Sequence, residues 1–222
     1  MLSATGGACI GAWLVRSRGL HALPGKLIVS PMLVSLGLWV ILSVYWEWAA
    51  RNAAATRSAE SGRSRALHLV LVSAAQLLTF WPYSGWPAAT APAFEFPRVL
   101  PAAPFFVPLG LALEVGGLWL AIWARRHLGR NWSGAVSVKV DHELVESGPY
   151  RRIRHPIYTG LIAMYLGAAL VSARLQGPLA IALISIAYAR KIGLEEQNLS
   201  RVFGPAFDGY RRRSWALVPW IV

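Results

Sequence analysis

The sequence predicts an all-α, polytopic integral membrane protein with about five transmembrane helices. Composition is the first observation behind this prediction. Of the 222 residues, 55% are hydrophobic and only 14% are charged, whereas soluble domains carry about 25% charged residues. The mean hydropathy is +0.45. The second observation is a series of long apolar runs, because a helix needs about 20 apolar residues to cross the ~30 Å hydrocarbon core of a bilayer.

Five apolar runs supply the predicted transmembrane helices. They cover residues 27–49, 67–81 with a continuation towards 86, 105–123, 157–175 and 178–189, the last extended by 192–194. Glu114 interrupts the third run. An acid inside a membrane is a functional candidate, although pairing with a neighbouring helix is the favoured interpretation. The sequence RLQGP at 174–178 predicts a tight turn, since Gly and Pro end regular structure, so the last two helices are expected to form a hairpin.

The length suits a single domain of residues 1–222. Residues 1–125 are expected to contribute mainly the N-terminal membrane helices. Residues 126–222 are expected to contribute two polar segments, one on each side of the helical hairpin. These two segments meet at the base of the hairpin and can therefore form a site.

The basic residues predict the orientation of this domain in the membrane. Arg and Lys concentrate in residues 51–65, 125–154 and 190–213, whereas the opposite loops hold only Arg98 and Arg174. The three basic segments are therefore predicted to be cytoplasmic, and this explains charges such as Arg125, Arg126 and Arg211–Arg213. The Ala/Arg/Gly-rich composition is typical of a bacterial inner-membrane protein.

The first 26 residues fit this orientation poorly. They lie on the side that the rule places outside, yet they contain Arg16, Arg18 and Lys26. An interfacial helix and a further membrane span both stay open for this segment.

Several function classes are disfavoured. The net charge is +12, but the basic residues lie between apolar runs without a nucleic-acid motif, so no nucleic-acid partner is expected. The five histidines lack the HxxxH and HExxH spacings and Cys9 is the only cysteine, so no metal is expected. The absence of GxGxxG and P-loop motifs argues against a soluble nucleotide-binding fold.

The polar segments carry the candidate chemistry. The first holds His142, Glu143, Tyr150, His155 and Tyr158, and the second holds Lys191, Glu195, Glu196, Gln197 and Asn198. If the fifth helix continues beyond the membrane, Lys191 and Glu195 lie one turn apart on one face. The alternative is a weak ion pair on a solvated helix face.

Two stretches resemble the isoprenylcysteine carboxyl methyltransferases and their bacterial relatives. They are HELVESGPYRRIRHPIYTG at 142–160 and EEQNLSRVFGPAFDGYRRR at 195–213. The shared pattern is LVxxGxY, then RHPxYxG, then EExxLxxxFGxx[YF]xxY. The residues that meet it are Leu144, Val145, Gly148, Tyr150, Arg154, His155, Pro156, Tyr158, Gly160, Glu195, Glu196, Leu199, Phe203, Gly204, Phe207 and Tyr210. The resemblance covers the last third to half of the chain.

The resemblance implies a membrane methyltransferase that uses S-adenosyl-L-methionine without a Rossmann domain. The implied cofactor contacts are His142, Glu143, Leu144, Val145, Tyr150, His155, Pro156, Ile157, Tyr158 and Glu195. Lys191 takes the place of the arginine that orients the acceptor carboxylate, and it is the candidate catalytic residue. Lysine keeps the charge but lacks the bidentate fork of arginine, and the neighbouring Arg190 is an alternative.

The implied partners are a lipophilic or lipid-anchored acceptor and membrane lipid. Methyl transfer from a sulfonium needs mainly position and a dry, suitably charged site. A carboxylate acceptor is already ionised at neutral pH, whereas an amine must first lose a proton. Other classes stay open: phospholipid or small-molecule N- or S-methylation, an NADPH-dependent sterol reductase and a non-enzymatic membrane protein. The reductases usually read RHPNY, and Ile157 occupies the asparagine position.

Overall fold

The computed structural model describes residues 30–51, 56–59, 61–81, 94–132, 137–139 and 143–219. The expectations for residues 1–26 and for His142 lie outside these ranges.

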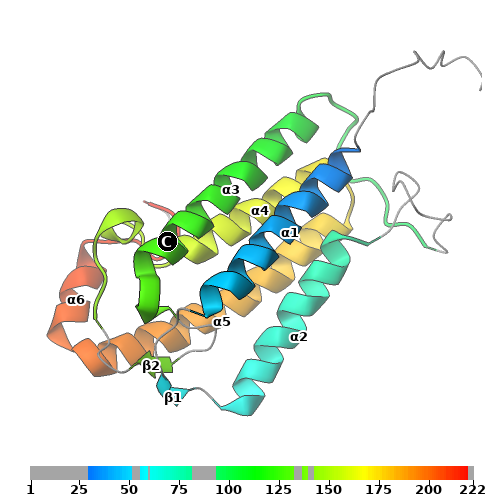
Figure 1. The fold of residues 1–222 in the computed structure, drawn as a ribbon. Helices are drawn as coiled ribbons and strands as arrows, with labels where there is room; N and C mark the ends of the chain where they lie inside the picture. The colour runs from blue at the N-terminus through cyan, green and yellow to red at the C-terminus, as the bar shows by residue number, and fades with distance from the viewer. Residues whose placement is uncertain are drawn as a thin grey trace, which may run out of the picture.

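Five long helices lie alongside one another and form the body of the protein (Figure 1). They are α1 (Pro31–Ala50), α2 (Gly62–Thr79), α3 (Phe106–Leu128), α4 (Pro156–Ser172) and α5 (Gln176–Phe203). Each predicted apolar run coincides with one of these helices, so the predicted all-α fold is confirmed.

Short elements gather at one end of the long helices. They are the 3-10 turns η1 (Gly129–Asn131) and η2 (Gly148–Arg151), the helix α6 (Pro205–Arg212) and the strands β1 (Thr56–Ala59) and β2 (Ser137–Lys139). The antiparallel pair of β1 with β2 is the only sheet among the described residues, and the sequence analysis did not predict it. This pair joins the segment after α1 to the segment after α3.

Among the residues that the structure describes, three helical segments are long and apolar enough to cross a membrane. They are α1, the segment Phe106–Asn131 that contains α3, and α5, while α4 is apolar but has only 17 residues. The number of about five spans therefore stays a prediction. α5 has 28 residues, which gives roughly 42 Å at about 1.5 Å per residue. This length exceeds the ~30 Å thickness of the hydrocarbon core. α5 continues to Phe203, past the predicted end of the apolar run at residue 194.

The predicted hairpin between α4 and α5 is present and is fixed by the segment before α3. Ala173 ends α4 in the left-handed region at φ 55°. Its carbonyl accepts a hydrogen bond from the N–H of Val99 at 2.9 Å. Arg174 pairs with Glu95 at 3.0 Å and donates to the carbonyl of Phe96 at 2.7 Å. The turn is therefore tight because a second segment satisfies its backbone groups.

Glycines set the distance between α3 and α4. A Cβ on Gly117 would lie 2.4 Å from the carbonyl oxygen of Gly160, and a Cβ on Gly110 would lie 2.6 Å from that of Gly167. Any larger side chain would push the two backbones apart. Close approach through small residues is a common way to pack membrane helices, where hydrophobic burial adds little. We call these four positions the glycine seam.

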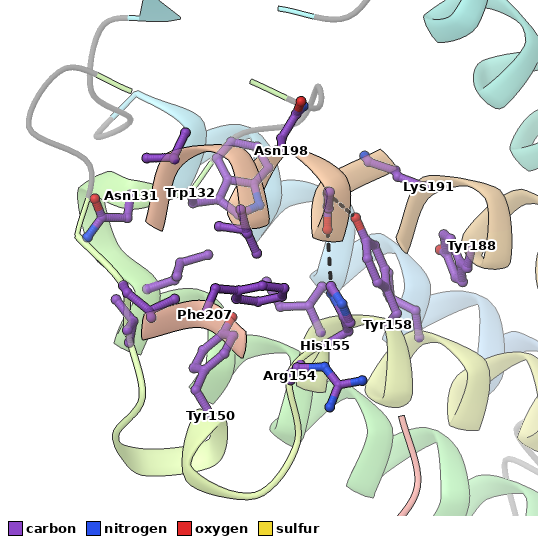
Figure 2. A pocket seen from close by; sticks show the side chains of 18 of the residues that line it. Asn131, Trp132, Tyr150, Arg154, His155, Tyr158, Tyr188, Lys191, Asn198 and Phe207 are labelled. Atoms are coloured by element: carbon purple, nitrogen blue, oxygen red, sulfur yellow. Dashed lines mark hydrogen bonds and ion pairs between the residues drawn. The ribbon is translucent and has the colours of Figure 1, made fainter. Parts of the chain in front are cut away.

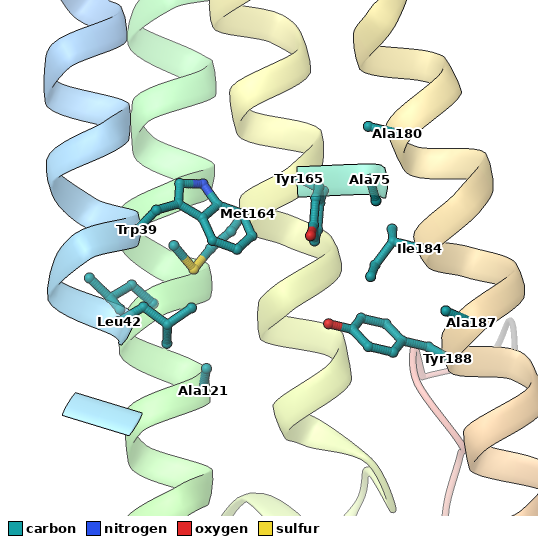
Figure 3. Close-up of a cluster of buried hydrophobic side chains, with 11 residues drawn as sticks. Trp39, Leu42, Ala75, Ala121, Met164, Tyr165, Ala180, Ile184, Ala187 and Tyr188 are labelled. Atoms are coloured by element: carbon teal, nitrogen blue, oxygen red, sulfur yellow. The ribbon is translucent and has the colours of Figure 1, made fainter. Parts of the chain in front are cut away.

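The apolar core lies between the other faces of the helices (Figure 3). Trp39 of α1 meets Tyr165 of α4 edge to face with ring centroids 4.7 Å apart. The hydroxyl of Tyr165 donates to Gln76 Oε1 of α2 at 2.9 Å. The core therefore ties α1 and α2 to α4.

Glu114 of α3 is fully buried in this helical body. It accepts a hydrogen bond from Ser35 Oγ of α1 at 2.9 Å. This is the interhelical pairing that the sequence analysis favoured over a direct functional role.

Candidate active site

A cavity of about 490 Å³ lies where the two polar segments meet (Figure 2). Its walls come from the ends of α1, α2, α3, α4 and α5, from residues 143–145, and from α6. The predicted residues that line it are Glu143, Leu144, Val145, Tyr150, His155, Ile157, Tyr158, Lys191 and Glu195. The two motifs that are distant in the sequence therefore share one cavity.

The RHP segment enters the cavity because the C-terminal segment holds it in an extended form. The N–H of Arg154 donates to the carbonyl of Trp215 at 2.8 Å, and the N–H of His155 donates to that of Ala216 at 3.0 Å. Pro156 then begins α4, where its missing N–H costs nothing. Pro156 is buried but is not part of the cavity wall. It acts on the site by starting the helix immediately after His155.

A buried polar network links this segment to α5. The hydroxyl of Tyr158 donates to Glu195 Oε1 at 2.7 Å, and His155 Nδ1 lies 3.5 Å from Glu195 Oε2. The other ring nitrogen of His155 lies 3.3 Å from Glu196 Oε1, which also accepts from Arg154 Nε at 2.8 Å. His155 therefore stands between two carboxylates.

This arrangement favours the charged form of His155. Burial alone lowers the pKa of His155, but the hydrogen bonds and charges of Glu195 and Glu196 outweigh it, so the pKa lies above its ordinary value. A cationic imidazole between two acids fixes both carboxylates in position. Glu196 was not among the predicted site residues, although it directly follows Glu195. Its function in this network is to hold Arg154 and His155.

Four aromatic rings form one wall of the cavity. His155 stacks on Tyr158 at 5.7 Å between ring centroids, and Tyr158 stacks on Tyr188 of α5 at 4.8 Å. The ring of His68 on α2 follows at 6.1 Å from Tyr188. We call these rings the aromatic wall. Tyr188 and His68 were not predicted from the sequence. The position of Tyr188 one turn before Lys191, on the same helix face, could have indicated that it lines the cavity.

Lys191 faces the cavity and is only 7% exposed. Its Nζ lies 5.9 Å from the ring centroid of Tyr158. Lys191 therefore does not lie on a solvated helix face, as the alternative interpretation required. Arg190 does not replace Lys191 in the cavity, because its guanidinium donates to Ser64 Oγ at 2.6 Å at the start of α2. The Arg190 alternative is wrong for this reason.

Tyr150 is fixed by partners on two other elements. Tyr210 of α6 donates its hydroxyl to the carbonyl of Tyr150 at 2.5 Å, and the hydroxyl of Tyr150 points to the carbonyl of Ala124 at 3.4 Å. Glu143 is exposed, and its backbone N–H donates to Asn131 Oδ1 at 3.4 Å. The first polar segment is therefore held at the cavity by contacts with α3, η1 and α6.

Arg125 is a further residue that the sequence analysis interpreted incompletely. It is buried, donates to the carbonyl of Ala49 at 2.5 Å and lies 4.2 Å over the ring of Trp132. It thereby ties α1 to α3 and holds an aromatic side chain of the cavity. A basic residue at a helix end was read only as a topology signal, because position along the chain does not reveal burial.

Metal binding finds no support within the described ranges. No group of three or more His, Cys, Asp or Glu side chains there is arranged to hold a metal ion.

Comparison with known proteins identifies relatives of the C-terminal half. Residues 105–206 match the sequence model of the phospholipid methyltransferase family. The chain is 37% identical over 116 residues to the nickel-cobalt-cadmium resistance protein NccN of Alcaligenes xylosoxydans xylosoxydans, covering 50% of this chain and 47% of that protein. It is 30% identical over 108 residues to the protein-S-isoprenylcysteine O-methyltransferase of Schizosaccharomyces pombe, covering 47% of this chain and 46% of that protein. The matches thus span about half the length of these relatives.

The fold is also that of a solved membrane enzyme. The structure of the eukaryotic intramembrane Ras methyltransferase, an isoprenylcysteine carboxyl methyltransferase, matches with a TM-score of 0.57 and 18% identity, over 88% of this chain and 69% of that one. The all-α membrane-protein fold that the motif resemblance implied is therefore confirmed. In its fold and in the sequence of its C-terminal half, the chain is similar to the isoprenylcysteine carboxyl methyltransferases.

Proposed function

We propose that the protein transfers a methyl group from S-adenosyl-L-methionine to a lipophilic acceptor, with O-methylation of a carboxylate favoured. The observation that carries this proposal is the meeting of the RHPIY and EE segments in one cavity, where Tyr158 and Glu195 join at 2.7 Å. The rest of the proposal follows from the chemistry of the side chains around that contact.

The cavity residues fit the cofactor in size and chemistry. A volume of about 490 Å³ falls within the range of roughly 300–1,000 Å³ typical of small-molecule pockets. Aromatic faces such as those of Tyr150 and Tyr158 suit an adenine ring or a sulfonium cation. The Glu195 carboxylate, already oriented by Tyr158, accepts hydrogen bonds from amine or hydroxyl groups. His142, Glu143, Leu144, Val145 and Ile157 complete the proposed cofactor-binding set, and Pro156 contributes to it by starting α4 directly after His155.

The bound cofactor supplies an activated methyl group, so the protein contributes position and charge. Lys191 provides a buried positive charge one turn before Glu195, and it orients the anionic head of the acceptor. The carboxylate needs no general base because it is ionised at neutral pH. We assign Lys191 this catalytic positioning of the acceptor.

The membrane setting explains why the acceptor is lipophilic. The cavity lies at the end of the helical body that carries the basic segments, and the positive-inside rule places this end in the cytoplasm. A soluble cofactor then enters from the cytoplasm, and the acceptor's tail stays among the helices. Cysteine introduced at the exposed Ser200, in a Cys9→Ala background, tests this orientation: impermeant maleimide should label it only after the cells are opened.

Phospholipid N-methylation is the second candidate, because the matching family model carries that name. Its acceptor is an ammonium group, which a wall containing Lys191 repels. Labelled-methyl transfer into a total lipid extract, followed by mass spectrometry of the products, separates esters from methylated amines.

Calorimetry with S-adenosylhomocysteine and NADPH tests the cofactor directly. We expect binding of S-adenosylhomocysteine alone. His155→Ala and Glu195→Ala each leave buried polar groups unpaired, which costs about 1–3 kcal/mol, or about five- to a hundredfold in affinity. Arg201→Gln on the exposed face of α5 is the control and should bind normally. Unchanged affinity in both site variants would contradict the proposal.

A further inference from the structure

The cavity continues beyond the proposed cofactor residues to a wall formed by α2. Four residues of this helix line it, and they follow one another at helical spacing along one face: Arg65, His68, Leu69 and Val72. Trp46 from α1 and Leu161 from α4 also line the cavity. None of these residues belongs to the motif segments.

The α2 face changes character along its length. Arg65 and His68 stand in its first two turns, whereas Leu69 and Val72 extend the face towards the helical body. Arg65 is exposed, while His68 is only 9% exposed. A wall that is cationic or hydrogen-bonding at one end and apolar at the other matches an amphiphile with a polar head and a hydrocarbon tail.

The aromatic wall connects this α2 face to the proposed methyl-transfer position. His68 meets Tyr188, and Tyr188 stacks on Tyr158, which holds Glu195. In Figure 2, Lys191 and Tyr188 lie on one side of Tyr158, and Trp132 and Asn131 lie on the other. The cofactor segments around Tyr150 share the side of Trp132. The side of Lys191 and His68 is therefore left for the second substrate.

We propose that Arg65 and His68 are acceptor-positioning residues, which act together with Lys191 to hold the anionic head of the acceptor. This inference rests on the proposed function. Arg65 and Lys191 attract an anion, and the ring nitrogens of His68 offer a hydrogen bond to it. The tail lies along Leu69, Val72 and Leu161.

The reaction at this position balances without a further partner. The carboxylate oxygen supplies the electron pair for the new bond to the methyl carbon, and the sulfonium sulfur keeps the pair of the broken bond. A neutral ester forms, and no proton has to be moved. An ammonium head group would meet the positive charges of Arg65 and Lys191 and would also need to lose a proton before attack.

The test compares two photoreactive probes that share one alkyl chain and differ only in the head. The anionic probe is N-acetyl-S-dodecylcysteine, and the cationic probe is S-dodecylcysteamine, each with a diazirine in the chain. Protein in nanodiscs of zwitterionic lipid is loaded with S-adenosylhomocysteine, illuminated with each probe and digested. Mass spectrometry then quantifies adducts on the peptides that line the cavity.

We expect the anionic probe to label the cavity peptides and the cationic probe to label them at least about tenfold less. Arg65→Gln and His68→Gln should each lower labelling by the anionic probe about tenfold, the loss expected for one charge-assisted contact. Arg65→Lys keeps the charge and should retain most of the labelling. Arg63→Gln is the matched control, because Arg63 is exposed on the same helix but is not part of the cavity wall.

The affinity for S-adenosylhomocysteine separates this inference from the proposed function. Normal affinity in Arg65→Gln and His68→Gln, together with reduced labelling, supports the inference. Equal labelling by the two probes, unchanged labelling in both variants, an equal loss in Arg63→Gln, or loss of S-adenosylhomocysteine binding in the α2 variants would overturn it. Failure of the wild-type protein to bind S-adenosylhomocysteine would instead overturn the proposed function.

Discussion

The glycine seam and the polar network hold the same helix, α4, in two different ways. Along the seam, α4 meets α3 through backbone atoms at Gly117 and Gly160, and contact requires only that side chains be absent. At the start of α4, Arg154 and His155 are held by specific acceptors on α5 and on the C-terminal segment. The seam depends on shape and the network on paired charge, so α4 can be a rigid support for a chemically specific site.

The largest effect is expected from breaking the polar network at Arg154. This side chain pairs with Glu196 and also donates to the carbonyls of Ser214 and Arg211. Arg154→Met removes the nearest cation from the mostly buried Glu196 carboxylate, and the loss of one partner of a buried ion pair costs up to roughly 3–5 kcal/mol. Arg152→Met, at an exposed neighbour, should change little. Thermal unfolding in detergent measures both variants; equal melting temperatures would show that the network contributes no stability.

The seam is tested by two adjacent glycines that differ only in their surroundings. Gly117→Ala places a Cβ against the backbone of α4, and overpacking of this kind costs about 1–3 kcal/mol. Gly116 has no neighbouring atom within 4 Å of a Cβ, so Gly116→Ala should be neutral or stabilise the helix by about 0.5–1 kcal/mol. The same unfolding assay reports both. If the two variants behave alike, close packing does not hold α3 against α4.

The sequence predicted these two regions unequally. Five apolar runs were enough to locate the long helices, because a long run of apolar residues is itself the sequence signal of a candidate membrane helix. The seam was not predicted, since a glycine in an apolar run does not reveal which helix it faces. The RHP and EE motifs located most of the cavity through a family resemblance. Tyr188, His68 and Arg65 were missed, and Glu196 was named without a role, because the roles of these residues depend on which helix faces meet, and that is decided by tertiary packing.

A smaller effect is expected from titrating His155. Its pKa in the folded protein lies above the ordinary value because Glu195 and Glu196 outweigh the effect of burial. The stabilisation is therefore fully present below the ordinary pKa of about 6.5 and is lost as the pH rises through the raised pKa. The melting temperature of the wild type should therefore fall relative to that of His155→Gln as the pH rises above about 6.5. Parallel profiles would show that His155 is not charged in the folded protein.

The smallest effect on cofactor binding is expected at Lys191. This residue lies on α5, as Glu195 and Glu196 of the polar network do, but we assign it to the acceptor and not to the cofactor. Lys191→Met keeps the packing of the stem and removes the charge. Its affinity for S-adenosylhomocysteine should change by well under tenfold, because Tyr158 and His155 still hold Glu195.

The same variant should lose acceptor turnover. KM rises if Lys191 binds the acceptor equally well in the ground state and in the transition state. The value of kcat falls if the contact of Lys191 with the acceptor strengthens during methyl transfer. Lys191→Arg retains the charge and should keep more activity than Lys191→Met with a carboxylate acceptor. Steady-state kinetics with N-acetyl-S-dodecylcysteine, alongside calorimetry, measures both quantities. Wild-type kinetic constants in Lys191→Met would mean that this buried lysine only supports the wall, and a large loss of cofactor affinity would move its role to the network around Glu195.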